Sequence, residues 1–138
     1  MVTLEPREAA KLVLYRGMED DDGRPRCHKH SLGVRLGTDI TPTEKGQVDP
    51  LTGGMSVAPD NPDHLPPHRK PRALGGTSDW PAWVLDVTSL AERPLSYRAD
   101  PSKPRKHGFV EPSEPMPTTS YVAALEATAE SWTRVDGT

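Results

Sequence analysis

Four places along the chain combine residue types that could carry chemistry. The first is Tyr15-Arg16, where a cation interrupts an otherwise apolar segment. A guanidinium is costly to bury unless it is paired or faces a cleft, so Arg16 is a candidate functional residue. The other three places hold a glycine-flanked hydroxyl, a histidine and a pair of carboxylates, at Gly53–Ser56, His107, and Glu111 with Glu114. None of the four is specific when taken alone.

Each of these residues also has a purely structural interpretation. Arg16 could be a salt-bridge partner for one of the many acids, Ser56 could end a strand, and His107 could hold a loop carbonyl. Tyr15 and Arg16 alternate along an extended segment, so one of them faces the core. Tyr15 is expected to be a core residue or a cleft wall.

The carboxylates are equally open to two interpretations. Glu111 and Glu114 lie on either side of Pro112 and could simply face solvent.

The segments that must position these residues are mostly extended. Apolar and aromatic runs predict strands at 12–17, 82–87 and 107–111, with shorter extended segments at 32–36, 53–57 and 95–98. Residues 20–31 are polar and basic and predict a loop. The spacing of Tyr121, Val122 and Leu125 predicts a helix, which Thr118 or Thr119 would cap. This order predicts a mostly β, α+β fold, with residues 1–138 forming one domain.

Proline shapes the connections between these elements. The chain has 138 residues, of which 16 are proline and 11 are glycine, and its hydrophobic share is 33%. That share is below the usual 45–50% even with glycine added, so the core is expected to be sparse. Residues 58–79 contain five prolines and predict a long surface loop, which in a compact domain is usually functional or mobile.

The charge and the cysteine content limit the classes of function. The net charge is −3, which gives no bulk reason to expect nucleic-acid binding. The basic clusters at 24–29 and 103–107 are most simply solvated loops. A single cysteine, Cys27, allows no intramolecular disulfide and fits a reducing cytoplasm. It fits no common metal motif with the histidines near it, so no metal site is predicted.

No segment of the sequence predicts a membrane helix. No run approaches the ~20 apolar residues that a membrane span requires. The first residues hold no apolar stretch long enough for a signal peptide, so export would require a dedicated secretion apparatus. A cytoplasmic site of action is therefore expected.

Taken together, the four places resemble the site of ADP-ribosyltransferases, and the chain as a whole resembles the Tse-two-type toxins, a family named for a type VI secretion effector. The matching pieces occur in the same order over residues 12–132. They are Leu12–Arg16, Leu32-Gly-Val34, Asp39-Ile40, Val48–Asp60, Trp83–Leu90 and His107–Met116. The most specific are the Gly-Gly-x-Ser-Val and His-x-x-Val-x-Pro-x-x-Pro-Met patterns.

The resemblance implies a fold and an activity. It implies two small, mostly antiparallel sheets with few helices and long proline-rich loops, and NAD as the substrate in a cleft between the sheets. Arg16, Ser56 and Glu111 would be catalytic. The residues that bind NAD would be Tyr15, Arg16, Gly54, Ser56 and His107. A carboxylate in such a site stabilises the oxocarbenium-like charge that develops as nicotinamide leaves. A cognate immunity protein would mask the cleft.

Two departures from the family pattern keep other functions open. Met55 replaces a threonine, and Gly108 replaces an aromatic residue that could wall the nicotinamide site. These changes favour an alternative in which the fold is kept, catalysis is lost, and toxicity comes from blocking a partner. A third possibility is a nuclease or RNA-modifying protein that uses His28, His30 and His107, although the acidic net charge argues against it.

Overall fold

Strands dominate the computed structural model, which describes residues 12–138. The strands are β1 (Val13–Gly17), β2 (Asp20–Asp21), β3 (Arg24–Pro25), β4 (Gln47–Val48), β5 (Met55–Pro59), β6 (Ala82–Asp86), β7 (Leu95–Ala99), β8 (Gly108–Pro112), β9 (Met116–Pro117) and β10 (Thr133–Arg134). The one α-helix of the described residues is α2 (Thr118–Glu126). Short 3₁₀ turns are η1 (Pro62–His64), η2 (Arg72–Leu74), η3 (Val87–Glu92) and η4 (Ala129–Ser131).

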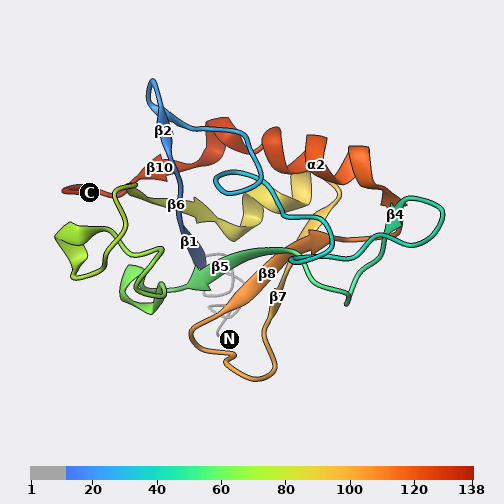
Figure 1. Cartoon of the computed structure of the whole chain (residues 1–138), viewed down its shortest axis with the longest axis horizontal. Coiled ribbons are helices and arrows are strands. Elements are labelled where there is room, and N and C mark those ends of the chain that lie inside the picture. Colours follow the sequence, from blue (N-terminus) through green and yellow to red (C-terminus); the bar gives the residue numbers. More distant parts are fainter. Residues whose placement is uncertain (1–11) are drawn as a thin grey trace, which may run out of the picture.

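Six strands form the main sheet, in the order β10-β6-β1-β5-β8-β7, and every pair is antiparallel (Figure 1). The β1–β6 ladder runs the full length of both strands, and so does the β7–β8 ladder. The central β1–β5 ladder is much shorter, because only Leu14–Pro59 and Tyr15–Ala58 are paired. Beyond Tyr15 the two strands part. The sheet therefore consists of two three-stranded halves joined by a short seam.

Helix α2 covers the core side of the sheet (Figure 1). Tyr121 and Leu125 are fully buried against strand residues that include Leu14 and Val110. The Tyr121 hydroxyl accepts a hydrogen bond from the Met55 amide at 3.1 Å and donates one to the Val110 carbonyl at 2.5 Å. Burial accordingly raises the pKa of Tyr121. The helix is thus attached to β5 and β8 by polar contacts as well as by packing.

The structure confirms the α+β class, the mostly antiparallel strands and the scarcity of helix. It differs from the sequence prediction in sheet topology, because the structure has one six-stranded sheet in place of two small sheets, beside the two-stranded ladders β2–β3 and β4–β9. Residues 20–31 were predicted to be a loop but contain the β2–β3 hairpin. Residues 32–36 form no strand, and only Leu36 makes an isolated bridge, to Ile40.

The helix begins differently from its prediction. Its N-cap is Pro117, with no side-chain cap, because the Thr118 hydroxyl donates to the Gly46 carbonyl at 2.8 Å. The proline-rich segment 58–79 contains η1 and η2. The prediction of no signal peptide falls on the first residues of the chain, of which residues 1–11 lie outside the described part.

Candidate functional site

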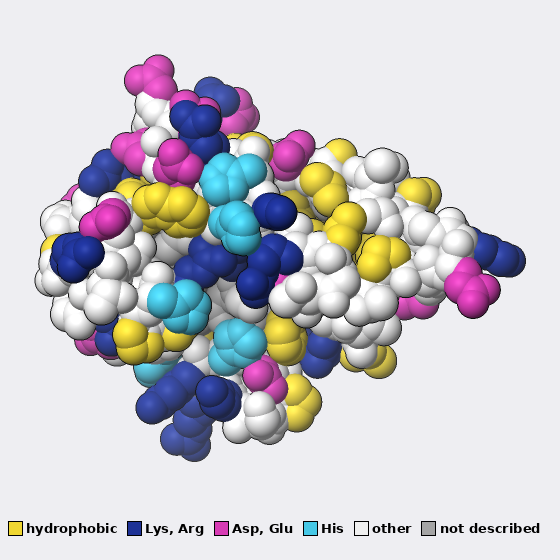
Figure 2. Space-filling model, viewed as in Figure 1, with side chains coloured by type: hydrophobic (Ala, Val, Ile, Leu, Met, Phe, Trp, Pro, Cys, Tyr) yellow, Lys and Arg dark blue, Asp and Glu magenta, His cyan; other side chains and the backbone are white. Residues whose placement is uncertain are grey.

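A pocket of about 540 Å³ opens where β1 and β5 part. Its wall comes from the ends of these strands, the proline-rich segment after β5, and the hairpin loop between β7 and β8. The charged residues that line it are the cations Arg16, Arg35, Arg69, Lys103 and Lys106 and the acids Asp39 and Asp100, and its histidines are His64, His68 and His107. Figure 2 shows lysine, arginine and histidine side chains gathered around a hollow on this face. The pocket is therefore strongly basic in a chain whose net charge is negative.

Arg16 lies at the floor of the pocket and is only 3% exposed. Its Nε donates to the Ser31 carbonyl at 2.8 Å, Nη1 to the Ser56 carbonyl at 2.7 Å, and Nη2 to the Gly33 carbonyl at 3.5 Å. Within residues 12–138 it forms no ion pair with a carboxylate. Burial and the nearby Arg69 lower the pKa of Arg16 to about 9, which leaves it charged at neutral pH. Carbonyl dipoles solvate this cation but do not neutralise it, so the floor of the pocket keeps a positive charge.

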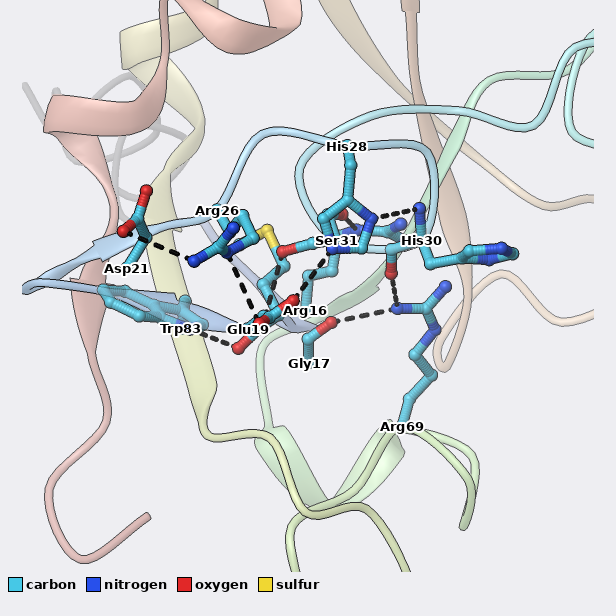
Figure 3. Close-up of polar contacts among 11 residues, drawn as sticks. Arg16, Gly17, Glu19, Asp21, Arg26, His28, His30, Ser31, Arg69 and Trp83 are labelled. Carbon is cyan, nitrogen blue, oxygen red and sulfur yellow. Dashed lines mark hydrogen bonds and ion pairs between the residues drawn. The ribbon is translucent and has the colours of Figure 1, made fainter.

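The carbonyls that hold Arg16 belong partly to the irregular segment 26–34 (Figure 3). Ser31 is fully buried, and its hydroxyl accepts from the Glu19 amide at 3.0 Å. Arg69 ties the same segment to β1, because its Nη1 donates to the carbonyls of Gly17 at 3.0 Å and His30 at 2.6 Å. Burial, followed by repulsion from Arg35, lowers the pKa of Arg69. Two arginines from different elements are thus fixed side by side around one segment.

Asp39 forms an ion pair with Arg35. Its Oδ1 accepts from Arg35 Nη2 at 2.9 Å, and its Oδ2 accepts from the Arg35 amide at 2.7 Å. This ion pair raises the pKa of Arg35. Asp39 therefore forms its ion pair with Arg35, and its nearby charge opposes the lowering of the Arg16 pKa without an ion pair between the two side chains.

The second acid of the pocket, Asp100, is hydrogen-bonded to His107. Asp100 Oδ2 lies 2.8 Å from His107 Nδ1. The hydrogen bond from His107, followed by those from Ser102, lowers the pKa of Asp100 to about 2. The carboxylate is therefore ionised at neutral pH.

The structure brings together three of the residues predicted from the sequence, namely Arg16, Ser56 and His107. Tyr15 does not line the pocket and packs instead with the small apolar cluster of Ala58, Leu65 and Ala82. The alternation of Tyr15 and Arg16 holds, but the charged residue is the more deeply buried of the two.

Glu111 lies on β8 outside the pocket lining. It is 5% exposed, and its Oε1 accepts from Arg98 Nε and from the Leu51 amide, both at 2.9 Å. Through these contacts Glu111 has a structural role: it neutralises Arg98 and holds the turn at Leu51, where φ is 70°. Glu114 is exposed in the turn that follows β8.

Gly54 also lies outside the lining, and its surroundings explain why the residue is glycine. Its φ is 155°, and a Cβ there would lie 2.6 Å from the Val110 carbonyl oxygen. Its amide donates to the Asp39 carbonyl at 2.9 Å. Gly54 thus permits a close approach of its backbone to β8 rather than to a ligand.

Substitution of Gly54 by alanine is expected to lower the free energy of unfolding by about 2–4 kcal/mol, because the added methyl meets backbone atoms that cannot move aside. Urea unfolding would measure the change. The matched control is Gly37→Ala, where φ is also positive but the space is open, so only backbone strain of about 1 kcal/mol is expected. Equal losses in the two variants would contradict a steric role for Gly54.

The two departures from the family pattern have structural explanations. Met55 is 1% exposed and faces the core, so a hydroxyl at this position would not reach the pocket. Gly108 is covered by the Tyr97 ring of the neighbouring strand β7, and a Cβ at 108 would lie 2.5 Å from the Tyr97 hydroxyl oxygen. The Tyr97 ring thus explains why position 108 is glycine, but Tyr97 itself does not line the pocket.

The sequence prediction missed most of the pocket's charges. Arg35, Arg69, Lys103 and Lys106 lie on irregular segments, and the sequence predicts only a solvated loop for the cluster at 103–107. His28 and His30, which the nuclease interpretation needs, are not in the lining. His28 is held by Glu19 at 3.0 Å.

Neither a metal centre nor a membrane span was found in the described part of the chain. Among residues 12–138, no group of three or more histidine, cysteine or acidic side chains could hold a metal ion. None of the helices described there is both long and apolar enough to cross a membrane. No protein-family model, curated protein or solved structure matches the chain.

Proposed function

We propose that the protein is a bacterial toxin that acts in the cytoplasm and binds NAD in this pocket, with an ADP-ribosyltransferase-like fold. The observation that carries the proposal is the buried Arg16, which has no carboxylate partner within residues 12–138 and lies at the floor of a pocket with four further cations. A guanidinium in this setting matches a phosphate group, and NAD carries two. The pocket volume is within the range of small-molecule sites.

The architecture agrees with this proposal. The pocket lies where β1 and β5 part within the six-stranded sheet, and the resemblance to ADP-ribosyltransferases implies a site between two groups of strands. Arg16 and Arg69 on one side, with Lys103 and Lys106 on the other, would hold the pyrophosphate. Ser56 and His107 would face the rest of the substrate. The products would be free nicotinamide and either ADP-ribose or a modified target.

The recognition of phosphate can be tested with a series of ligands. Calorimetric titration of the purified chain is expected to show binding of NAD and ADP-ribose but not of nicotinamide riboside, which has no phosphate. The double variant Lys103→Gln/Lys106→Gln should weaken NAD binding about tenfold, because two cations of the pocket rim are lost. Arg105→Gln is the matched control, since Arg105 is exposed in the same loop but does not line the pocket. Equal binding of the riboside and NAD would contradict the proposal.

A second candidate function is supported by the state of the carboxylates. Asp39 is paired with Arg35, Asp100 with His107, and Glu111 with Arg98 outside the pocket. No carboxylate of the described lining is left to stabilise an oxocarbenium ion directly. In this alternative the chain is a non-catalytic toxin that blocks an acidic partner through the same pocket. It would arrest growth without lowering cellular NAD.

Either function requires that the producing cell be protected. A cognate immunity protein that covers the basic rim would serve both, and delivery into a target cell would use a secretion system. Co-expression with an immunity protein should restore growth in either case. The level of cellular NAD during arrest separates the two candidates.

A further inference from the structure

A histidine–aspartate dyad closes the loop between β7 and β8 at the edge of the pocket. The Asp100 amide donates to the His107 carbonyl at 2.9 Å, and the two side chains meet at 2.8 Å. The other carboxylate oxygen, Oδ1, accepts from the Ser102 amide and hydroxyl, both at 2.9 Å. The His107 ring also contacts Phe109 edge-on, with ring centres 5.0 Å apart. The orientation of both side chains is therefore fixed from several directions.

This arrangement determines which nitrogen of His107 is available. Of the two neutral tautomers of His107, a carboxylate at Nδ1 selects the one that carries its proton on Nδ1 and leaves a lone pair on Nε2. Within residues 12–138, Nε2 makes no hydrogen bond, whereas Nδ1 is engaged. His107 lines the pocket, and its side chain is 29% exposed. It has the properties of a general base that can reach a bound substrate.

We infer that His107, positioned by Asp100, is the general base that activates water, so that the protein is an NAD glycohydrolase. This inference rests on the proposed function. The bond between C1′ of the ribose and the nicotinamide nitrogen breaks, and its electron pair leaves with neutral nicotinamide. A water oxygen forms the new bond to C1′, and its proton passes to Nε2 of His107. The products are ADP-ribose, nicotinamide and a proton that His107 releases to solvent.

The charge of the rim favours water over a basic side chain as the acceptor. Arg35, Arg69, Lys103 and Lys106 line the pocket. They would repel an arginine or lysine of a target protein, because like charges at close range are unfavourable. Water carries no charge and is not repelled. A base is what water needs, since it is a weak nucleophile until a proton is removed.

The test compares binding with turnover in the purified full-length chain. NAD affinity is measured by calorimetry, and nicotinamide release by chromatography. His107→Gln is expected to lower kcat about 10²–10⁴-fold with NAD affinity changed less than about threefold. Asp100→Asn is expected to lower kcat about 10²-fold without raising KM, because it disturbs the tautomer of His107 and not the binding of phosphate. His30→Gln, an exposed histidine outside the pocket, is the matched control.

The outcomes separate this inference from the function on which it rests. Absence of NAD binding by the unaltered chain would overturn the proposed function. Binding with wild-type nicotinamide release in a folded His107→Gln variant would overturn only the role of His107. Binding with no release, or transfer of the ADP-ribosyl group to a macromolecule, would overturn the glycohydrolase. If His107→Gln does not fold, the split between kcat and KM in Asp100→Asn decides.

Discussion

Replacement of Arg16 by alanine is expected to abolish NAD binding and toxicity and to lower the free energy of unfolding by about 2–4 kcal/mol. The loss of binding follows from removal of the one buried cation that has no ion-pair partner among residues 12–138. The loss of stability follows because the carbonyls of Ser31, Gly33 and Ser56 lose their donor. Part of the lost stability is regained, because the folded variant no longer bears the desolvation cost of a buried charge.

The test combines growth assays in cells with measurements of NAD binding and stability on the purified variants. The wild type, expressed from a tight inducible promoter in a bacterial host, should arrest growth and lower total NAD, and Arg16→Ala should do neither. Arg16→Lys keeps the charge but places its donors on a single nitrogen, whereas three separate nitrogens of Arg16 reach the three carbonyls, so it should retain part of the binding and of the stability. Arg72→Ala is the control, because its exposed pair with Asp79 contributes little. Full NAD binding by Arg16→Ala would remove Arg16 from the site.

Replacement of Tyr121 by phenylalanine is expected to lower the free energy of unfolding by about 2–3 kcal/mol. The change removes only one oxygen, but it leaves two buried backbone groups, the Met55 amide and the Val110 carbonyl, without their partner. Unsatisfied buried groups cost more than the hydrogen bond itself contributes. Urea unfolding, with the denaturation slope checked for constancy, measures the difference.

Tyr15→Phe provides the comparison for this variant. The Tyr15 hydroxyl makes no hydrogen bond within residues 12–138, and its side chain is only partly buried. Its removal should change stability by less than about 0.5 kcal/mol. If the two variants lost equal stability, the polar attachment of α2 to β5 and β8 would not matter.

The longer strands were predictable because their patterns are local. Alternation and aromatic content placed β1, β6 and β8 to within a residue or two, and helical spacing placed α2. The two-residue strands are too short to show such a pattern in the sequence. β10 exists because Thr133 and Arg134 lie beside β6, and that neighbour is set by the path of the whole chain. Local propensity carries no information about such pairings.

The site was predictable only where a residue conflicted with its surroundings. Arg16 stood out because a cation in an apolar strand must be accounted for, and it proved to be the buried floor of the pocket. Arg69 and Lys103 gave no such signal, since cations in irregular segments are usually solvated. For Glu111 a signal was present in the sequence, but in the structure this residue pairs with Arg98 outside the pocket lining. Its partner Arg98 is recognisable only when the β7–β8 register is known.

The concentration of cations in one pocket has a kinetic consequence. The chain as a whole carries −3, so the surface outside the pocket must be more negative than that. Such a charge separation creates a field that guides anions toward the pocket and turns them away from other faces. Encounters with a small anion should therefore be faster than for an evenly charged molecule, and they should slow as ionic strength rises. Departure of the anion depends on Arg16, which is shielded from salt by burial, and should change much less.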